Sequence, residues 1–173
     1  MKKVLLMISF SLLSCSSFAI DNYSIYLVRH AEKLSNAKNP ALTDCGTARA
    51  RLLATMLSKA KITAIYSTSY QRTMQTAKPL ANLQKTAIKN YNPKNLEQLS
   101  LLLKQKTENT LVVGHSNTTP RLVTLLAKQK VAPLTEQDYQ YLYQVQFFKG
   151  QPLLTIFQQP LNCKTSQIGN KLD

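Results

Sequence analysis

Acidic residues are scarce in this 173-residue chain, with eight Asp and Glu against 22 Lys and Arg and a formal net charge of +14 at pH 7. This excess favours anionic partners, which include nucleic acid, lipid headgroups and phosphorylated small molecules. The lysines from Lys59 to Lys106 are scattered and form no dense run, and no nucleic-acid-binding motif is present. We therefore predict no nucleic-acid partner and expect a phosphorylated one.

The N-terminus lacks an apolar run long enough to cross a bilayer, which takes about 20 residues. Its run from Val4 to Leu13 follows two lysines and is succeeded by small and polar residues up to Ala19. This order is typical of a secretory signal peptide, so we predict a signal peptide over residues 1–19, cleavage after Ala19, and export to a bacterial periplasm. Lipidation of Cys15, in a loose lipoprotein box, is the alternative and the one route we foresee to a membrane.

Cysteine and histidine are also few. Removal of residues 1–19 leaves two cysteines, Cys45 and Cys163, and their spacing leaves open whether they form a disulfide or stay as free thiols. The two histidines, His30 and His115, have no cluster of cysteines or carboxylates at ligand spacing beside them. We therefore predict no metal and no cofactor.

Strand and helix patterns alternate along the rest of the chain. Short β-rich runs predict strands at 23–28, 62–66 and 110–113, and amphipathic or capped runs predict helices at about 46–59, 70–83, 95–106 and 119–128. Residues 139–157 alternate as in a sheet and are divided by Lys149-Gly150, which predicts a hairpin. The pattern indicates an α/β fold with a mostly parallel central sheet, in one domain over 20–160 followed by a tail at 161–173 that we expect to be flexible.

Basic side chains gather just past the predicted strand ends. Arg29 and His30 follow the first strand, Arg72 opens the helix after the second, and His115 follows the third. Open parallel sheets bind ligands at this edge, so we expect one shared site, although each residue alone would be ordinary at a surface or in a core. Guanidinium groups repel cations and match phosphate oxygens, and helix N-termini after Ser69 and Thr119 would add N–H donors. The sequence predicts a phosphate pocket.

Four ordered segments resemble the histidine phosphatase superfamily, which is also named for phosphoglycerate mutase. They are Leu27-Val28-Arg29-His30-Ala31-Glu32, Leu42-Thr43-Asp44-Cys45-Gly46, Tyr66-Ser67-Thr68-Ser69-Tyr70-Gln71-Arg72-Thr73-Met74-Gln75-Thr76-Ala77 and Val113-Gly114-His115-Ser116-Asn117. The resemblance implies a three-layer sandwich. It makes His30 the nucleophile, Arg29 and Arg72 the phosphate clamp, and His115 the second histidine on the phosphoryl group.

The resemblance leads us to expect a histidine acid phosphatase-like hydrolase that acts on phosphomonoesters through a phosphohistidine. Its substrate would be a phosphorylated small molecule or a phosphorylated component of the cell envelope. A mutase is less expected, because the chain is too short for the insertions that enclose a phosphoglycerate.

The acid that protonates the leaving group is ambiguous from sequence. Glu32 is our candidate and Glu97 the alternative, while Ser116 and Asn117 are candidates for hydrogen bonds to substrate. Without an unambiguous acid, a non-catalytic anion-binding envelope protein that retains the pocket remains the competing interpretation.

Overall fold

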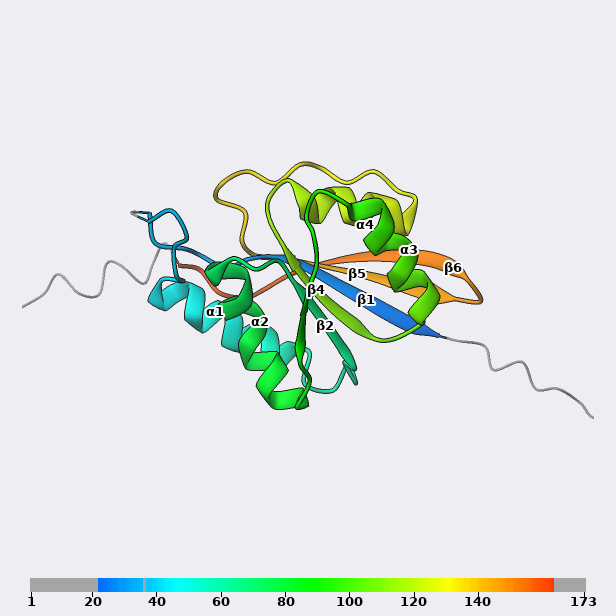
Figure 1. Cartoon of the computed structure of the whole chain (residues 1–173), viewed down its shortest axis with the longest axis horizontal. Coiled ribbons are helices and arrows are strands. Elements are labelled where there is room, and N and C mark those ends of the chain that lie inside the picture. Colours follow the sequence, from blue (N-terminus) through cyan, green and yellow to red (C-terminus); the bar gives the residue numbers. More distant parts are fainter. Residues whose placement is uncertain (1–21, 36, 164–173) are drawn as a thin grey trace, which may run out of the picture.

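The computed structural model of the chain describes residues 22–35 and 37–163 (Figure 1). The predicted signal peptide at 1–19, Cys15 and the last ten residues of the predicted tail lie outside the described residues. No helix in the described part is long and apolar enough to span a bilayer.

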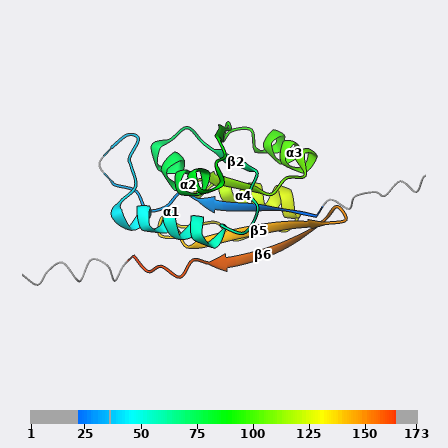
Figure 2. The ribbon, with the colours of Figure 1, turned by 90° about the horizontal axis from the view of Figure 1, so that it is seen from below.

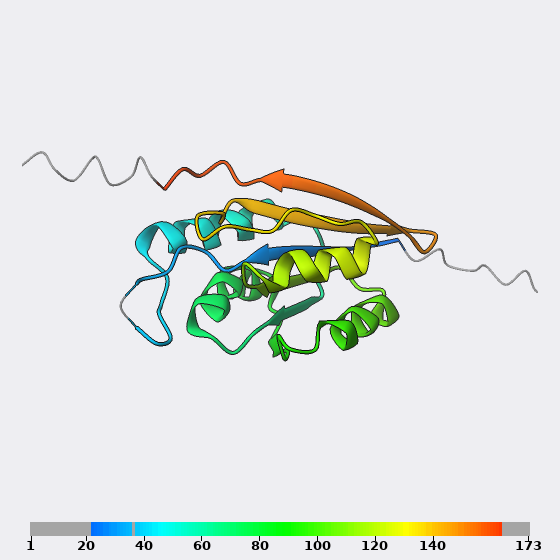
Figure 3. The same ribbon diagram turned by 90° about the horizontal axis from the view of Figure 1, so that it is seen from above.

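One six-stranded sheet forms the centre of the molecule, with the order β3-β2-β4-β1-β5-β6. Its strands are β1 (Tyr23–Arg29), β2 (Ala64–Ser67), β3 (Ile88–Asn90), β4 (Thr110–Gly114), β5 (Tyr141–Phe148) and β6 (Gln151–Gln158). Strands β1 to β4 pair in parallel, and β5 and β6 add an antiparallel hairpin to the β1 edge. Figures 2 and 3 show β6 as the outer strand on that side.

Two pairs of helices cover opposite faces of the sheet, which confirms the predicted α/β layers (Figure 1). The pairs are α1 (Asp44–Met56) with α2 (Gln71–Gln84), and α3 (Leu96–Lys106) with α4 (Thr118–Ala127). Neighbouring residues of β1 point to opposite faces, as in any strand. Leu27 therefore joins the core beneath α3 and α4, while Val28 joins the core beneath α1 and α2.

Local sequence features determine where helix α1 begins and where the chain turns between β5 and β6. The hydroxyl of Thr43 caps α1 by accepting a hydrogen bond from the Gly46 N–H at 3.0 Å, and Asp44 adds negative charge to the first turn. In the β5–β6 hairpin Lys149 and Gly150 have φ of 50° and 74°, the left-handed values that a tight hairpin turn requires. The predicted hairpin is confirmed.

Sequence reasoning missed β3 and placed the N-cap of α4 two residues late, at Thr119 rather than at Asn117. Strand β3 has three residues with half-buried or exposed side chains, so no apolar run announces it. Helix α4 begins at Thr118, and the Thr118 hydroxyl in its first turn accepts a hydrogen bond from the His115 N–H at 2.9 Å.

A disulfide joins Cys45 in α1 to Cys163, with the two Cα atoms 5.8 Å apart. Arg49, also in α1, donates a hydrogen bond to the Leu161 carbonyl at 3.1 Å. The described residues of the segment that we expected to be flexible, 161–163, are thus held against α1 by a covalent bond and a buried guanidinium.

Candidate active site

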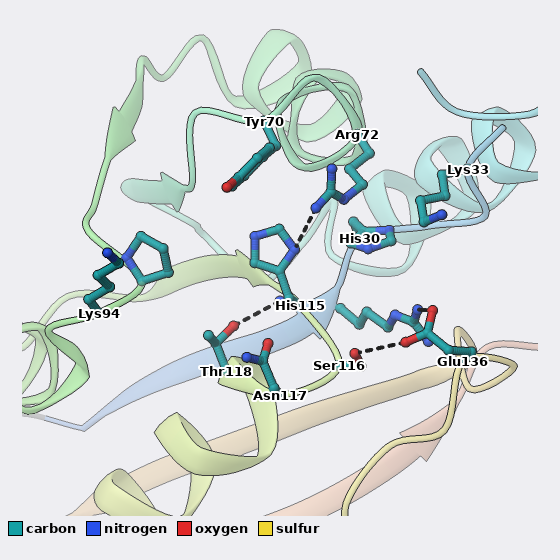
Figure 4. A pocket seen from close by; sticks show the side chains of 12 residues that line it. His30, Lys33, Tyr70, Arg72, Lys94, His115, Ser116, Asn117, Thr118 and Glu136 are labelled. Atoms are coloured by element: carbon teal, nitrogen blue, oxygen red, sulfur yellow. Dashed lines mark hydrogen bonds and ion pairs between the residues drawn. The ribbon is translucent and has the colours of Figure 1, made fainter. Parts of the chain in front are cut away.

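The carboxyl ends of the parallel strands bring the predicted residues together. Arg29 ends β1 and pairs in register with Gly114, the last residue of β4, and the His30 N–H donates to the Gly114 carbonyl at 2.9 Å. This register sets His30 beside His115, with ring centroids 5.5 Å apart. Arg72 reaches the same place from the first turn of α2 (Figure 4).

These side chains open into a pocket of about 380 Å³. It is lined by Arg29, His30, Lys33, Tyr70, Arg72, Pro93, Lys94, His115, Ser116, Asn117, Thr118 and Glu136. All six residues that we predicted for phosphate binding, nucleophilic attack or substrate hydrogen bonding are among them; their chemical roles remain predictions.

His30 is held as a neutral ring with one nitrogen available. Its Nδ1 lies 2.8 Å from the Ala31 carbonyl, which can only accept, so Nδ1 carries the proton and Nε2 keeps its lone pair. The pKa of His30 is lowered to about 3, chiefly by burial and also by the charges of Arg29 and Arg72, against the opposing Ala31 hydrogen bond. At neutral pH the ring is therefore uncharged, with its one proton on Nδ1 and an unshared electron pair on Nε2.

His115 is fixed by hydrogen bonds at both nitrogens. Arg72 Nη2 donates to Nδ1 at 3.5 Å, so Nε2 carries the proton and donates to the Thr68 hydroxyl at 3.0 Å. The Thr68 hydroxyl in turn donates a hydrogen bond to the Thr73 hydroxyl, because the Thr73 hydroxyl uses its own proton to donate to the backbone carbonyls of Thr68 and Tyr70. Burial, followed by the charges of Arg72 and Arg29, lowers the pKa of His115 to about 4.

The two arginines supply fixed positive charge. Arg29 is 3% exposed, lies 4.2 Å above the Tyr139 ring and donates to the Thr135 carbonyl at 2.7 Å. Arg72 stacks 4.5 Å from the Tyr70 ring. The Nε atoms of both arginines are buried and have no hydrogen-bond partner among the described residues. Buried donors without acceptors are costly, so an anion between these residues would be strongly favoured.

The structure places neither predicted acid in the pocket. The Glu32 carboxylate accepts hydrogen bonds from Arg49 Nε and Nη2, at 2.9 and 2.6 Å, and Arg49 is itself buried. Glu97 is exposed on α3 and pairs with Arg121 of α4. Glu32 lies close to His30 in the chain, but the buried arginine on α1 holds its carboxylate.

Several pocket residues were not predicted: Lys33, Tyr70, Lys94, Thr118 and Glu136. Glu136 accepts hydrogen bonds from Arg29 Nη2 at 2.9 Å and from the Ser116 hydroxyl at 3.2 Å. It lies between α4 and β5, where the sequence has no helical or strand periodicity to relate it to the strand ends. No local signal could have found it.

One cluster within the described residues has the composition of a metal site. Ligand atoms of Glu32, Cys45 and Cys163 lie within 4.8 Å of one another. The two sulfur atoms are bonded to each other, so neither is a free thiolate, and Arg49 already neutralises the carboxylate. These residues do not fit a metal ion.

Comparisons with known proteins confirm the resemblance that the motifs indicated. The model of the histidine phosphatase superfamily (branch 1) matches residues 25–92. No curated protein matches the chain.

Solved structures share the fold. The protein histidine phosphatase SixA, complexed with tungstate, is 17% identical, with 79% of this chain and 97% of that chain covered and a TM-score of 0.65. Mycobacterial glucosyl-3-phosphoglycerate phosphatase is 11% identical, with coverages of 82% and 100% and a TM-score of 0.63. Phosphoserine phosphatase from Entamoeba histolytica, in complex with 3-phosphoglyceric acid, is 16% identical, with coverages of 79% and 96% and a TM-score of 0.58.

Proposed function

We propose that this chain, which resembles the histidine phosphatase superfamily in its fold and in residues 25–92, is a phosphatase that hydrolyses phosphomonoesters through a phosphohistidine at His30. The observation that carries the proposal is the neutral His30 ring, whose Nδ1 is bound to the Ala31 carbonyl while two arginines and a second histidine surround it. A neutral imidazole attacks phosphorus, whereas an imidazolium cannot.

The arginines suit the transition state of phosphoryl transfer. As negative charge spreads over the equatorial oxygens, Arg29 and Arg72 stabilise it from fixed positions. Arg29 is packed between the Thr135 carbonyl and the Tyr139 ring, so little reorganisation is needed during the reaction. The phosphoryl group then passes from His30 to water, which releases inorganic phosphate.

His115 would donate a hydrogen bond from Nδ1 to a phosphoryl oxygen only when its ring is protonated. In the free protein its neutral Nδ1 accepts from Arg72 and has no proton to offer a phosphoryl oxygen. A bound phosphate dianion favours the charged ring and opposes the burial that lowers the pKa of His115. Phosphate binding should therefore be accompanied by proton uptake at this residue.

Lysines at the pocket rim support a substrate with more than one anionic group. Lys33 and Lys94 line the pocket together with the arginines, and no acidic residue other than Glu136 lines it within the described part of the chain. The solved structures with this fold include proteins named for phosphohistidine, phosphoserine and phosphoglycerate chemistry, which spans phosphoproteins and small metabolites. We place the substrate in the cell envelope because of the predicted signal peptide.

The test is hydrolysis of 2,4-dinitrophenyl phosphate, whose leaving group needs no proton, by the wild type and by His30→Ala in excess EDTA. We expect turnover that the substitution abolishes, and a radiolabelled phosphoenzyme, stable in alkali and labile in acid, that only the wild type forms. Glu97→Gln, an exposed substitution outside the pocket, is the control for altered charge.

Two outcomes would contradict the proposal. Loss of activity in EDTA with recovery on adding a divalent cation would replace the mechanism with a metal-dependent one. Tight phosphate binding without turnover or a trapped phosphohistidine would favour the anion-binding protein, an interpretation motivated by the absence of both predicted acids from the pocket.

A further inference from the structure

The mechanism proposed above has no assigned proton donor for the leaving group, and one carboxylate lines the pocket. Of the twelve residues that line the pocket, Glu136 is the one with a carboxylate. Its side chain is 76% exposed and forms an ion pair with Arg29. Figure 4 shows it pointing toward Ser116, whose hydroxyl donates to it.

The backbone around Glu136 is anchored, and its exposed side chain is held at the pocket by Arg29 and Ser116. The preceding carbonyl, that of Thr135, accepts a hydrogen bond from Arg29 Nη1 at 2.7 Å. The Thr135 N–H and hydroxyl both donate to the Asp138 carboxylate, at 2.7 and 2.6 Å. The turn is thereby tied to the arginine that would bind the phosphoryl group, and the Glu136 carboxylate stays at the pocket rim.

We propose that Glu136 is the general acid that protonates the departing oxygen, and that the chain therefore acts on phosphomonoesters of aliphatic alcohols. The proposal rests on the phosphatase function above. Alkoxides are poor leaving groups that need a proton as the bond to phosphorus breaks, whereas activated phenolates do not.

The proposed hydrolysis has two steps, and Glu136 gives up one proton in the first and regains one in the second. His30 Nε2 bonds to phosphorus as the ester P–O bond breaks, and the alkoxide oxygen takes the proton of Glu136. The resulting carboxylate then takes a proton from water while the water oxygen bonds to phosphorus and the P–N bond breaks. Phosphate leaves, His30 regains its lone pair, and Glu136 is protonated again.

Substrate binding prepares Glu136 for this role. A phosphoryl oxygen would compete for the same Arg29 Nη2 that the carboxylate occupies at 2.9 Å, so substrate binding would release the Glu136 carboxylate from this arginine at the pocket. A carboxyl group next to a dianion favours its protonated form because like charges repel.

None of the other carboxylates among the described residues lines the pocket, and three of them are held by partners of their own. Glu32 is bound by Arg49, Glu97 by Arg121, and Asp138 by Thr135. The nearby phenol of Tyr139 is a weaker acid than usual, because burial raises its pKa.

The experiment compares Glu136→Gln with the wild type on an alkyl ester, glycerol 1-phosphate, and on 2,4-dinitrophenyl phosphate. We expect kcat/KM for the alkyl ester to fall about 100-fold or more, in the range measured for loss of a general acid, and kcat/KM for the aryl ester to change less than about threefold. Glu97→Gln should leave both unchanged, and Glu136→Asp should recover part of the alkyl activity.

Each alternative result identifies what fails. An equal fall in kcat/KM for both esters would show that Glu136 positions Arg29 rather than donating a proton. An unchanged kcat/KM for the alkyl ester in Glu136→Gln would also overturn the proposal, and so would a wild type that is inactive on glycerol 1-phosphate. In these cases His30-dependent turnover of the aryl ester still upholds the phosphatase. If the wild type does not hydrolyse the aryl ester either, the phosphatase itself is wrong.

Discussion

At the scale of single residues, the proposed chemistry depends on the protonation states of two imidazoles, and the chain has no other histidine. Nuclear magnetic resonance should therefore show two ring titrations in the folded protein, with midpoints near the lowered pKa values of about 3 for His30 and about 4 for His115. Neither signal should shift between pH 8 and pH 5.5. In urea both should titrate near 6.5, the value of a solvated imidazole. A folded-state midpoint above 6 would contradict the neutral nucleophile.

The same pKa shift at His30 makes the folded state sensitive to acid. Its folded pKa lies below its unfolded pKa, so the unfolded chain binds more protons between them and stability falls as pH drops below about 6.5. Between pH 7 and pH 5 we expect a loss on the order of 2 kcal/mol from this residue, measured by urea unfolding. The His30→Gln variant should lose correspondingly less over the same interval, and an equal loss would contradict the assignment.

The sequence was sufficient to predict Arg29, His30, Arg72 and His115 as neighbours, because each follows a strand or opens the next helix and parallel strands end together. It was insufficient to decide which carboxylate lines the pocket. The position of Glu32 is decided by Arg49, 17 residues away along the chain, and that of Glu136 by Arg29, 107 residues away. Hydrogen bonds over such separations leave no periodicity to detect.

At the scale of elements, the join between β4 and α4 depends on the small size of Gly114. A Cβ there would lie 2.9 Å from the Thr118 and Thr119 hydroxyls and 3.0 Å from the Tyr91 hydroxyl. We expect Gly114→Ala to destabilise the fold by about 1–3 kcal/mol, the usual cost of overpacking, and to reduce kcat by moving His115.

Urea unfolding and aryl phosphate turnover check this prediction, with Gly150→Ala as the matched glycine control. At Gly150 an added Cβ meets nothing within 4 Å, although its φ of 74° makes alanine strained there. The control should lose some stability and keep its turnover. Full activity in Gly114→Ala would show that the β4–α4 join tolerates the extra methyl group.

The helices were predicted to within about three residues because their apolar spacing and caps are local. Strand β3 was missed for the opposite reason. Its register, Ile65 with Ile88 and Ser67 with Asn90, exists only once β2 is in place, and its own three residues are poorly buried. Short edge strands depend on their neighbours more than on their sequence.

At the scale of the whole molecule, the Cys45–Cys163 disulfide should dominate stability. It joins residues 118 positions apart, and the chain-entropy model assigns about 4–5 kcal/mol to a loop of this size. We expect dithiothreitol to lower the urea midpoint of the wild type markedly and to leave a Cys45→Ser, Cys163→Ser double variant unchanged. If the urea midpoint of the wild type were the same with and without dithiothreitol, the Cys45–Cys163 disulfide would be contradicted.

The fold class was predictable at this scale, whereas the disulfide was an open question. Alternating strand and helix patterns are read along the chain and determine the layers. A disulfide requires two Cα atoms within a few ångströms of each other, a distance set by how α1 and the segment after β6 pack, and no spacing in the sequence reports that.

The same bond turns most of the protein into a covalent ring. Residues 46–162, which include every helix after the start of α1 and all strands but β1, lie between its two cysteines. A single protease cut in the exposed stretch around Pro133 would therefore open the ring without releasing a fragment. His30 and Glu136 would then lie on different peptides that migrate as one band until a reductant is added.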